Sequence, residues 1–113
     1  MDDEEWKTET AGIPVKGKEI TSANILGVSA GTTAPAGGDA GHGGRTLVRI
    51  EDLGGTAWGV RITGHDGVSY TLGEPTDLQL GSVEILLGGD TEAETIAEAL
   101  EFAAETIRKA LGN

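Results

Sequence analysis

The sequence predicts an α+β fold, an antiparallel β-meander or small β-sandwich with one C-terminal α-helix. Two observations indicate this class. Short segments rich in β-branched and aliphatic residues alternate with glycine-containing turns over residues 19–88. One stretch of helical periodicity follows at residues 91–111. No internal repeat divides the 113 residues, so we expect a single compact domain over residues 19–113.

The N-terminal residues 1–18 are predicted to form an acidic, mobile tail. Five acids fall within the first nine residues, with Trp6 as the one large apolar side chain there. Such charge density opposes burial in a core, and termini are ordered only when something holds them.

The strands are expected in five segments, which are residues 19–30, 45–51, 56–63, 68–72 and 78–88. The turn sequence Asp52–Gly55 predicts that the second and third segments form a hairpin. A second turn at Gly64–Gly67 would add the fourth segment to the meander, and the last segment has room for one or two short strands.

The helix predicted over residues 91–111 has one apolar stripe, formed by Ile96, Leu100, Ala103, Ile107 and Leu111. Thr91 and Glu94 have the spacing of a capping box, and Gly112 follows as a stop signal. Phe102 lies off the stripe. We therefore expect a helix packed on both sides that mediates a homo-oligomer, a dimer or higher.

The charge balance excludes several classes of partner. Nineteen acidic against eight basic residues give a formal net charge of -11, which opposes binding to duplex nucleic acid or to an anionic membrane. The chain has no cysteine, so it has no disulfide and no thiolate nucleophile. The acidic start is not a signal peptide, and we expect a cytoplasmic protein.

Six of the fourteen residues from Gly31 to Gly44 are glycine, and this loop supplies the candidate site. Glycine-rich backbone can present amides to an anion, and a guanidinium binds phosphate or carboxylate in a bidentate manner. The predicted ligand is a small anionic, nucleotide-like molecule. The candidate ligand-binding residues are Gly37, Gly38, Asp39, Gly41, His42, Gly43, Gly44, Arg45 and Thr46.

Other interpretations of this loop remain open. It matches neither a P-loop nor a dinucleotide fingerprint, because no lysine follows the glycines and a strand comes next. It can equally be a glycine-rich surface loop without a ligand. Two histidines give too few ligands for a metal site, and no catalytic constellation is evident, so we expect neither a metal nor a cofactor nor an enzyme.

The segment Ser22–Leu53, with its GGDAGHGGRT run, and the helix segment Gly88–Leu111 resemble parts of small phage and prophage proteins. The chain is similar to the phage anti-defence proteins that sequester nucleotide immune signals, the Thoeris anti-defence sponges. The resemblance implies a β-sandwich-like domain that oligomerises and binds a cyclic nucleotide signal without degrading it, inside a bacterial host cell.

An alternative function follows from the charge alone. A dense negative field attracts basic partners, so the chain could be an acidic phage or bacterial interaction protein that binds a basic protein and no small molecule. A metal-assisted hydrolase is the third hypothesis, and it lacks the required constellation.

Overall fold

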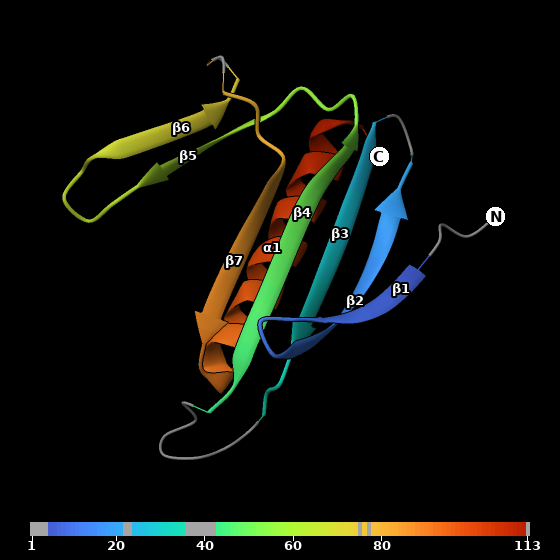
Figure 1. Cartoon of the computed structure of the whole chain (residues 1–113), viewed down its shortest axis with the longest axis vertical. Coiled ribbons are helices and arrows are strands. Elements are labelled where there is room, and N and C mark those ends of the chain that lie inside the picture. The colour runs from blue at the N-terminus through green and yellow to red at the C-terminus, as the bar shows by residue number, and fades with distance from the viewer. Residues whose placement is uncertain (1–4, 22–23, 36–42, 75, 77, 113) are drawn as a thin grey trace.

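A computed structural model describes residues 5–21, 24–35, 43–74, 76 and 78–112. Five strands form one antiparallel sheet in the order β1-β2-β3-β4-β7 (Figure 1). They are β1 (Glu5–Thr10), β2 (Ile13–Ile20), β3 (Ile25–Thr32), β4 (Arg45–Gly54) and β7 (Ser82–Gly88). The other elements are the strand pair β5 (Gly59–Thr63) and β6 (Ser69–Gly73), and the helix α1 (Asp90–Ala110). The predicted α+β fold, an antiparallel meander with one C-terminal helix, is confirmed.

The prediction of a mobile tail is wrong for residues 5–18, which form β1 and most of β2. Trp6 stands opposite Gly17 in the register, and a Cβ on Gly17 would overlap its indole ring. Lys16 and Glu5 form an exposed ion pair at 3.1 Å. The charged residues point to one face while the apolar ones reach the other, so a charged segment still contributes to the sheet. Residues 1–4 lie outside the described residues.

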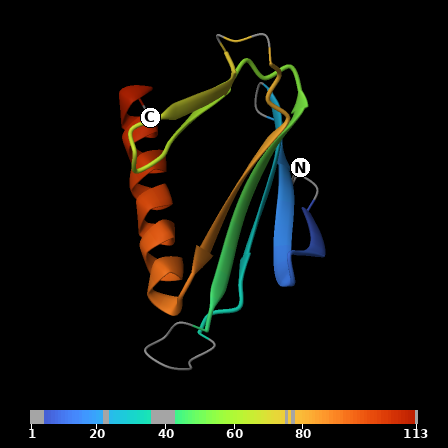
Figure 2. The ribbon, with the colours of Figure 1, turned by 60° about the vertical axis from the view of Figure 1, so that its left-hand side comes forward.

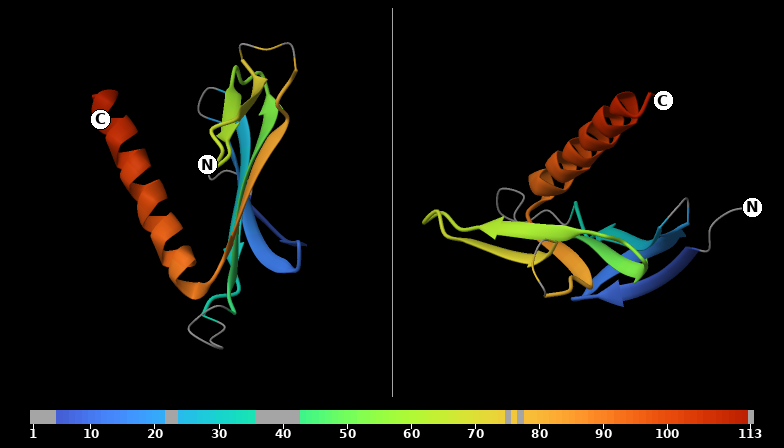
Figure 3. Two further views of the ribbon diagram at one scale, coloured as in Figure 1. Left: turned by 90° about the vertical axis from the view of Figure 1, so that its left-hand side faces the viewer. Right: turned by 90° about the horizontal axis from the view of Figure 1, so that it is seen from above.

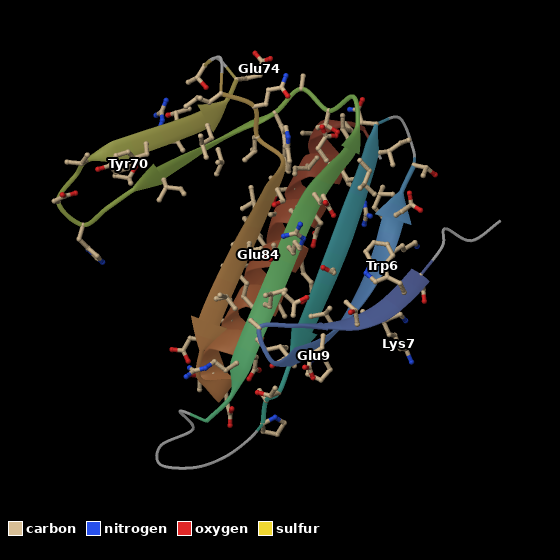
Figure 4. The ribbon with its side chains drawn as sticks, viewed as in Figure 1. Trp6, Lys7, Glu9, Tyr70, Glu74 and Glu84 are labelled. Carbon is tan, nitrogen blue, oxygen red and sulfur yellow. The ribbon has the colours of Figure 1, made fainter. Side chains whose placement is uncertain are left out.

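The sheet has two faces of different character, and the small core lies on one of them. Ile13, Val15 and Leu47 form a buried cluster on this face, which we call the core face. Arg49, which pairs with Glu84 at 2.8 Å, lies on the same face. Figure 4 shows Trp6 and Glu84 on the side turned away from α1, so the core face is opposite the helix.

The other face, which we call the helix-side face, is almost entirely apolar in its centre. Residues that pair in register share a face, and the register places one set of aliphatic side chains here. The set is Ile20, Leu26, Val28, Ala30, Val48, Ile50, Val83, Ile85 and Leu87. Of these only Val48 is buried, and Ile85 is 42% exposed.

The predicted hairpin of residues 45–51 with 56–63 is wrong. β4 continues through the predicted turn to Gly54 and pairs with β3 and β7. The Asp52 carboxylate accepts hydrogen bonds from the amides of Gly54 and Thr56, at 3.0 and 3.3 Å, where the chain leaves the sheet. β5 pairs with β6 instead, around the predicted turn at Gly64–Gly67. This β5–β6 hairpin, which we call the arm, extends away from the sheet (Figure 1; Figure 3, right).

One further strand prediction needs correction. The segment 19–30 contains the end of β2 and most of β3 rather than one strand, and β3 continues to Thr32. A reversal of the chain direction replaces the continuous run there, because β2 and β3 pair antiparallel. The segment 78–88 contains one strand, β7, which is within the prediction of one or two short strands.

The helix begins at Asp90 and ends at Ala110, against the predicted 91–111. The capping box is not formed. Gly89 is the N-cap, with φ 116°, and the Thr91 hydroxyl donates to Glu92 at 3.0 Å. No residue of α1 is buried, so the expected packing on both sides does not occur within the chain. Figures 2 and 3 show α1 meeting the sheet at its N-terminal end and diverging from it.

Candidate functional site

The described ends of the predicted binding loop follow β3 and precede β4, at the end of the sheet where α1 begins (Figure 1). The amide of Gly89 donates to the carbonyl of Gly44 at 2.7 Å, so the exit of the loop is bonded to the start of the helix. Gly37, Gly38, Asp39, Gly41 and His42 lie outside the described residues. Gly43, Gly44, Arg45 and Thr46 are described.

Two of these four residues make contacts that support the fold. Thr46 is buried, and its hydroxyl lies 2.9 Å from that of Thr32 across the β3–β4 pair. Gly44 is buried against the helix, because a Cβ there would contact the Asp90 carboxylate. A role in ligand binding stays a prediction for both, but their neighbours explain them without a ligand.

Arg45 and Thr46 are consecutive in β4, so their side chains point to opposite faces of the sheet. Arg45 lies on the core face, where its Nη1 would be 2.8 Å from a Cβ on Gly88. Together with Ala11, Ile13 and Leu86 it lines a shallow concavity of about 330 Å³. The structure therefore does not bring Arg45 and Thr46 together toward one ligand.

The opposite side of this end of the sheet is acidic. Asp90 and Glu94 line a concavity of about 410 Å³ with Thr32 and Pro35. The Asp90 carboxylate, in the first turn, interacts favourably with the helix dipole, and both carboxylates repel an anion. Any anion at this end is therefore expected on the Arg45 side.

A third concavity of about 400 Å³ lies where the arm leaves the sheet. The Trp58 indole N–H donates to the Leu80 carbonyl at 2.9 Å at this point, and Asp52 and Glu74 supply two carboxylates. Among the described residues that line it, none is basic. It supports the base of the arm and offers an anion two carboxylates and no cationic side chain.

The described residues contain no group of three or more histidines, cysteines and acids that could hold a metal ion. Within the same part of the chain, no helix has the length and apolarity needed to cross a membrane.

Sequence reasoning missed the arm as a separate feature. The register places Val60, Ile62, Tyr70 and Leu72 on one face of the two-stranded ribbon. Ile62 is 61% exposed and Tyr70 is 71% exposed (Figure 4). The paired glycines Gly54 and Gly55 before the arm and Gly73 after it were the available signal, because they allow the chain to leave the sheet.

The helix presents two opposed surfaces. The predicted apolar stripe is present but uncovered, since Leu100, Ile107 and Leu111 are 43%, 59% and 71% exposed. The other surface, which we call the acidic stripe, is formed by Glu94, Glu98, Glu101 and Glu105, all exposed. Glu105 pairs with Lys109 at 2.8 Å.

No family model, curated protein or solved structure matches the chain. The similarity to phage signal-sequestering proteins stays a prediction.

Proposed function

We propose that this chain is a non-catalytic interaction protein that works by binding other protein chains. The observation that supports the proposal is the uncovered apolar surface of the arm and of α1. A two-stranded hairpin is at most marginally stable alone in water, and large exposed apolar surfaces are typical of protein-binding sites. The arm and α1 therefore have a physical reason to contact another chain.

The charge of the molecule indicates the chemistry of such a partner. The acidic stripe follows one side of α1 over three turns, opposite the apolar stripe, so both can be engaged at once. With a net charge of -11, long-range attraction favours a protein with a basic surface. The proposal keeps the predicted cytoplasmic location, in a bacterial host if a phage encodes the chain.

Charge variants of the helix test this function. The bait Glu98→Gln/Glu101→Gln neutralises the centre of the acidic stripe, and Glu9→Gln/Glu74→Gln removes the same charge elsewhere. The parent chain is expected to capture one stoichiometric basic protein from bacterial lysate, with or without added nucleotides. At 0.1 M salt, where the screening length is about 10 Å, the helix variant should retain at least about threefold less of the captured protein than the parent chain does.

Equal capture by both variants would contradict the role of the acidic stripe. Recovery of no stoichiometric protein at all would overturn the proposed function.

A second candidate function is the predicted sequestration of a nucleotide-like anion. It is favoured by one observation, the position of the Arg45 guanidinium at the exit of the glycine-rich loop, on the face away from Asp90 and Glu94. In this candidate function the nucleotide is bound and released unchanged.

Calorimetry with cyclic ADP-ribose isomers and cyclic dinucleotides tests this candidate. Arg45→Ala should weaken binding about tenfold or more, since a charge-assisted bidentate contact is lost. Arg61→Ala, on the arm, serves as the matched control and should bind like the parent. Undiminished binding by Arg45→Ala would refute the site, and degraded nucleotide after heat denaturation would indicate an enzyme.

A further inference from the structure

We infer that α1 binds the α1 of a second copy of this chain, antiparallel, through the apolar stripe and with Leu100 at the centre of the contact. This inference rests on the proposed function and names one partner for the apolar surface of the helix. Three observations support it: the exposed area of the chain, the order of large and small residues along α1, and its charge.

The chain exposes far more surface than a folded monomer of its size. Its accessible surface is 8163 Å², whereas a monomer of 11.5 kDa is expected to expose about 5,800 Å². The difference of about 2,400 Å² is of the size that each subunit of an obligate dimer buries, about 1,000 to 2,500 Å². The apolar stripe and the arm carry several of the exposed large apolar side chains, among them Leu100, Ile107 and Tyr70.

Closure of α1 on its own sheet does not cover all of the exposed apolar side chains. Phe102 is 72% exposed and lies almost opposite the apolar stripe on the helix, so one packing partner cannot bury both. Ile62 and Tyr70 on the arm also stay uncovered. A second chain is needed whether or not α1 moves toward the sheet.

The residue order along α1 fits a second α1 that runs in the opposite direction. With Leu100 level with Leu100 of the second copy, Ile96 comes level with Ala104 and Ile107 with Ala93. On either side of the central Leu100 pair, large side chains then meet small ones, which permits close packing of two helices. In a parallel pair, each large residue would meet the same large residue of the second copy.

The charges of α1 favour the same direction. Asp90 and Glu92 lie in the first turn, and Arg108 and Lys109 lie in the last. An antiparallel pair brings the basic turn of one helix level with the acidic turn of the other. The two helix dipoles then lie side by side and point in opposite directions, which is favourable. A parallel pair would align the two acidic stripes.

Single cysteines test the arrangement, because the chain has none of its own. Under oxidation, Leu100→Cys is expected to form a disulfide-linked dimer in high yield. Leu111→Cys should not, because the two copies of this position lie about 33 Å apart in the antiparallel pair at 1.5 Å per residue. Glu98→Cys, on the acidic stripe, is the control for random collision and should also form no disulfide cross-link.

Light scattering on the full parent chain supplies the second measurement. The expected mass is at least twice 11.5 kDa, and Leu100→Glu/Ile107→Glu should lower it to that of one chain. Thr106→Glu, exposed and off the stripe, should leave the mass unchanged. Circular dichroism checks that each variant folds, which is expected because α1 carries no buried residue.

Three outcomes would overturn the inference. They are a parent chain with the mass of one copy, cross-linking of Leu111→Cys, and equal cross-linking of Leu100→Cys and Glu98→Cys. A monomer that still captures a basic protein would refute the helix pair and leave the proposed function standing. A cross-linked dimer that captures no basic protein would support the helix pair and refute the proposed function.

Discussion

Gly31 determines how closely β2 can lie over the core face of the sheet. A Cβ on Gly31 would lie 2.9 Å from the Cα of Val15 and would overlap the Pro14 carbonyl oxygen. These are backbone atoms, which cannot rotate out of the way as a flexible side chain can. The glycine is therefore required by the approach of two strands rather than by a turn, and nothing local in the sequence distinguishes the two reasons.

Gly31→Ala is expected to lower the free energy of unfolding by about 2 kcal/mol, as overpacking of a close contact does. Gly81→Ala is the matched control, because a Cβ there has open space, with nothing within 4 Å. Its effect should stay within about 0.5 kcal/mol. Urea denaturation at one fixed protein concentration measures both, and equal midpoints for the two variants would contradict this explanation of Gly31.

The candidate site shows a second limit of sequence-based prediction, which concerns the side chains of neighbouring residues. Assigning Gly37 to Thr46 to one candidate site implied that Arg45 and Thr46 serve the same ligand. Because β4 begins at Arg45, the two side chains point to opposite faces. The Thr46 hydroxyl forms its hydrogen bond with the Thr32 hydroxyl. The predicted strand at 45–51 already implied this separation, since alternation is a property of every strand.

At the scale of the element, the sequence predicted the kind of each segment better than its partner. The helix lies within one residue of the predicted range, and the turn at Gly64–Gly67 forms as expected. The strand that follows Asp52–Gly55 pairs with β6, as the meander predicted, but not with β4. Periodicity is local and records which face of a segment is apolar, whereas pairing depends on strands that are distant along the chain.

The same limit applies to the N-terminal segment. Its charge predicted a tail, yet β1 and β2 are paired over six residue pairs from Glu5 and Lys18 to Thr10 and Ile13. Pairing satisfies the backbone whatever the side chains are, and the charged ones point away from the core face. Composition alone does not indicate whether a charged segment pairs with a neighbouring strand.

For the whole molecule, the radius of gyration of 15.8 Å exceeds the value of about 13 Å expected for a compact chain of 113 residues. The fully buried large side chains are Ile13 and Leu47 among the described residues. So small a core provides little stability by itself. We therefore expect association to supply part of the stability of the fold.

If association stabilises the fold, the melting temperature depends on protein concentration. A hundredfold increase, from 1 to 100 µM, is expected to raise Tm by about 5 to 10 °C, because mass action favours the associated native state. Leu100→Glu/Ile107→Glu should melt lower and show no such dependence. A Tm of the parent chain that is constant over this range would contradict stabilisation by association.

The sequence by itself determined the α+β class, the extent of the helix, its apolar and acidic stripes and the turn of the arm. These follow from periodicity and turn chemistry, which act over a few residues. Only the tertiary structure decided that residues 5–18 join the sheet, that the arm leaves it, and that Arg45 and Thr46 separate. It also decided that the apolar stripe stays uncovered within one chain. Those outcomes depend on which distant segments pair and on how much apolar surface the paired segments can bury, and both are properties of the assembled molecule.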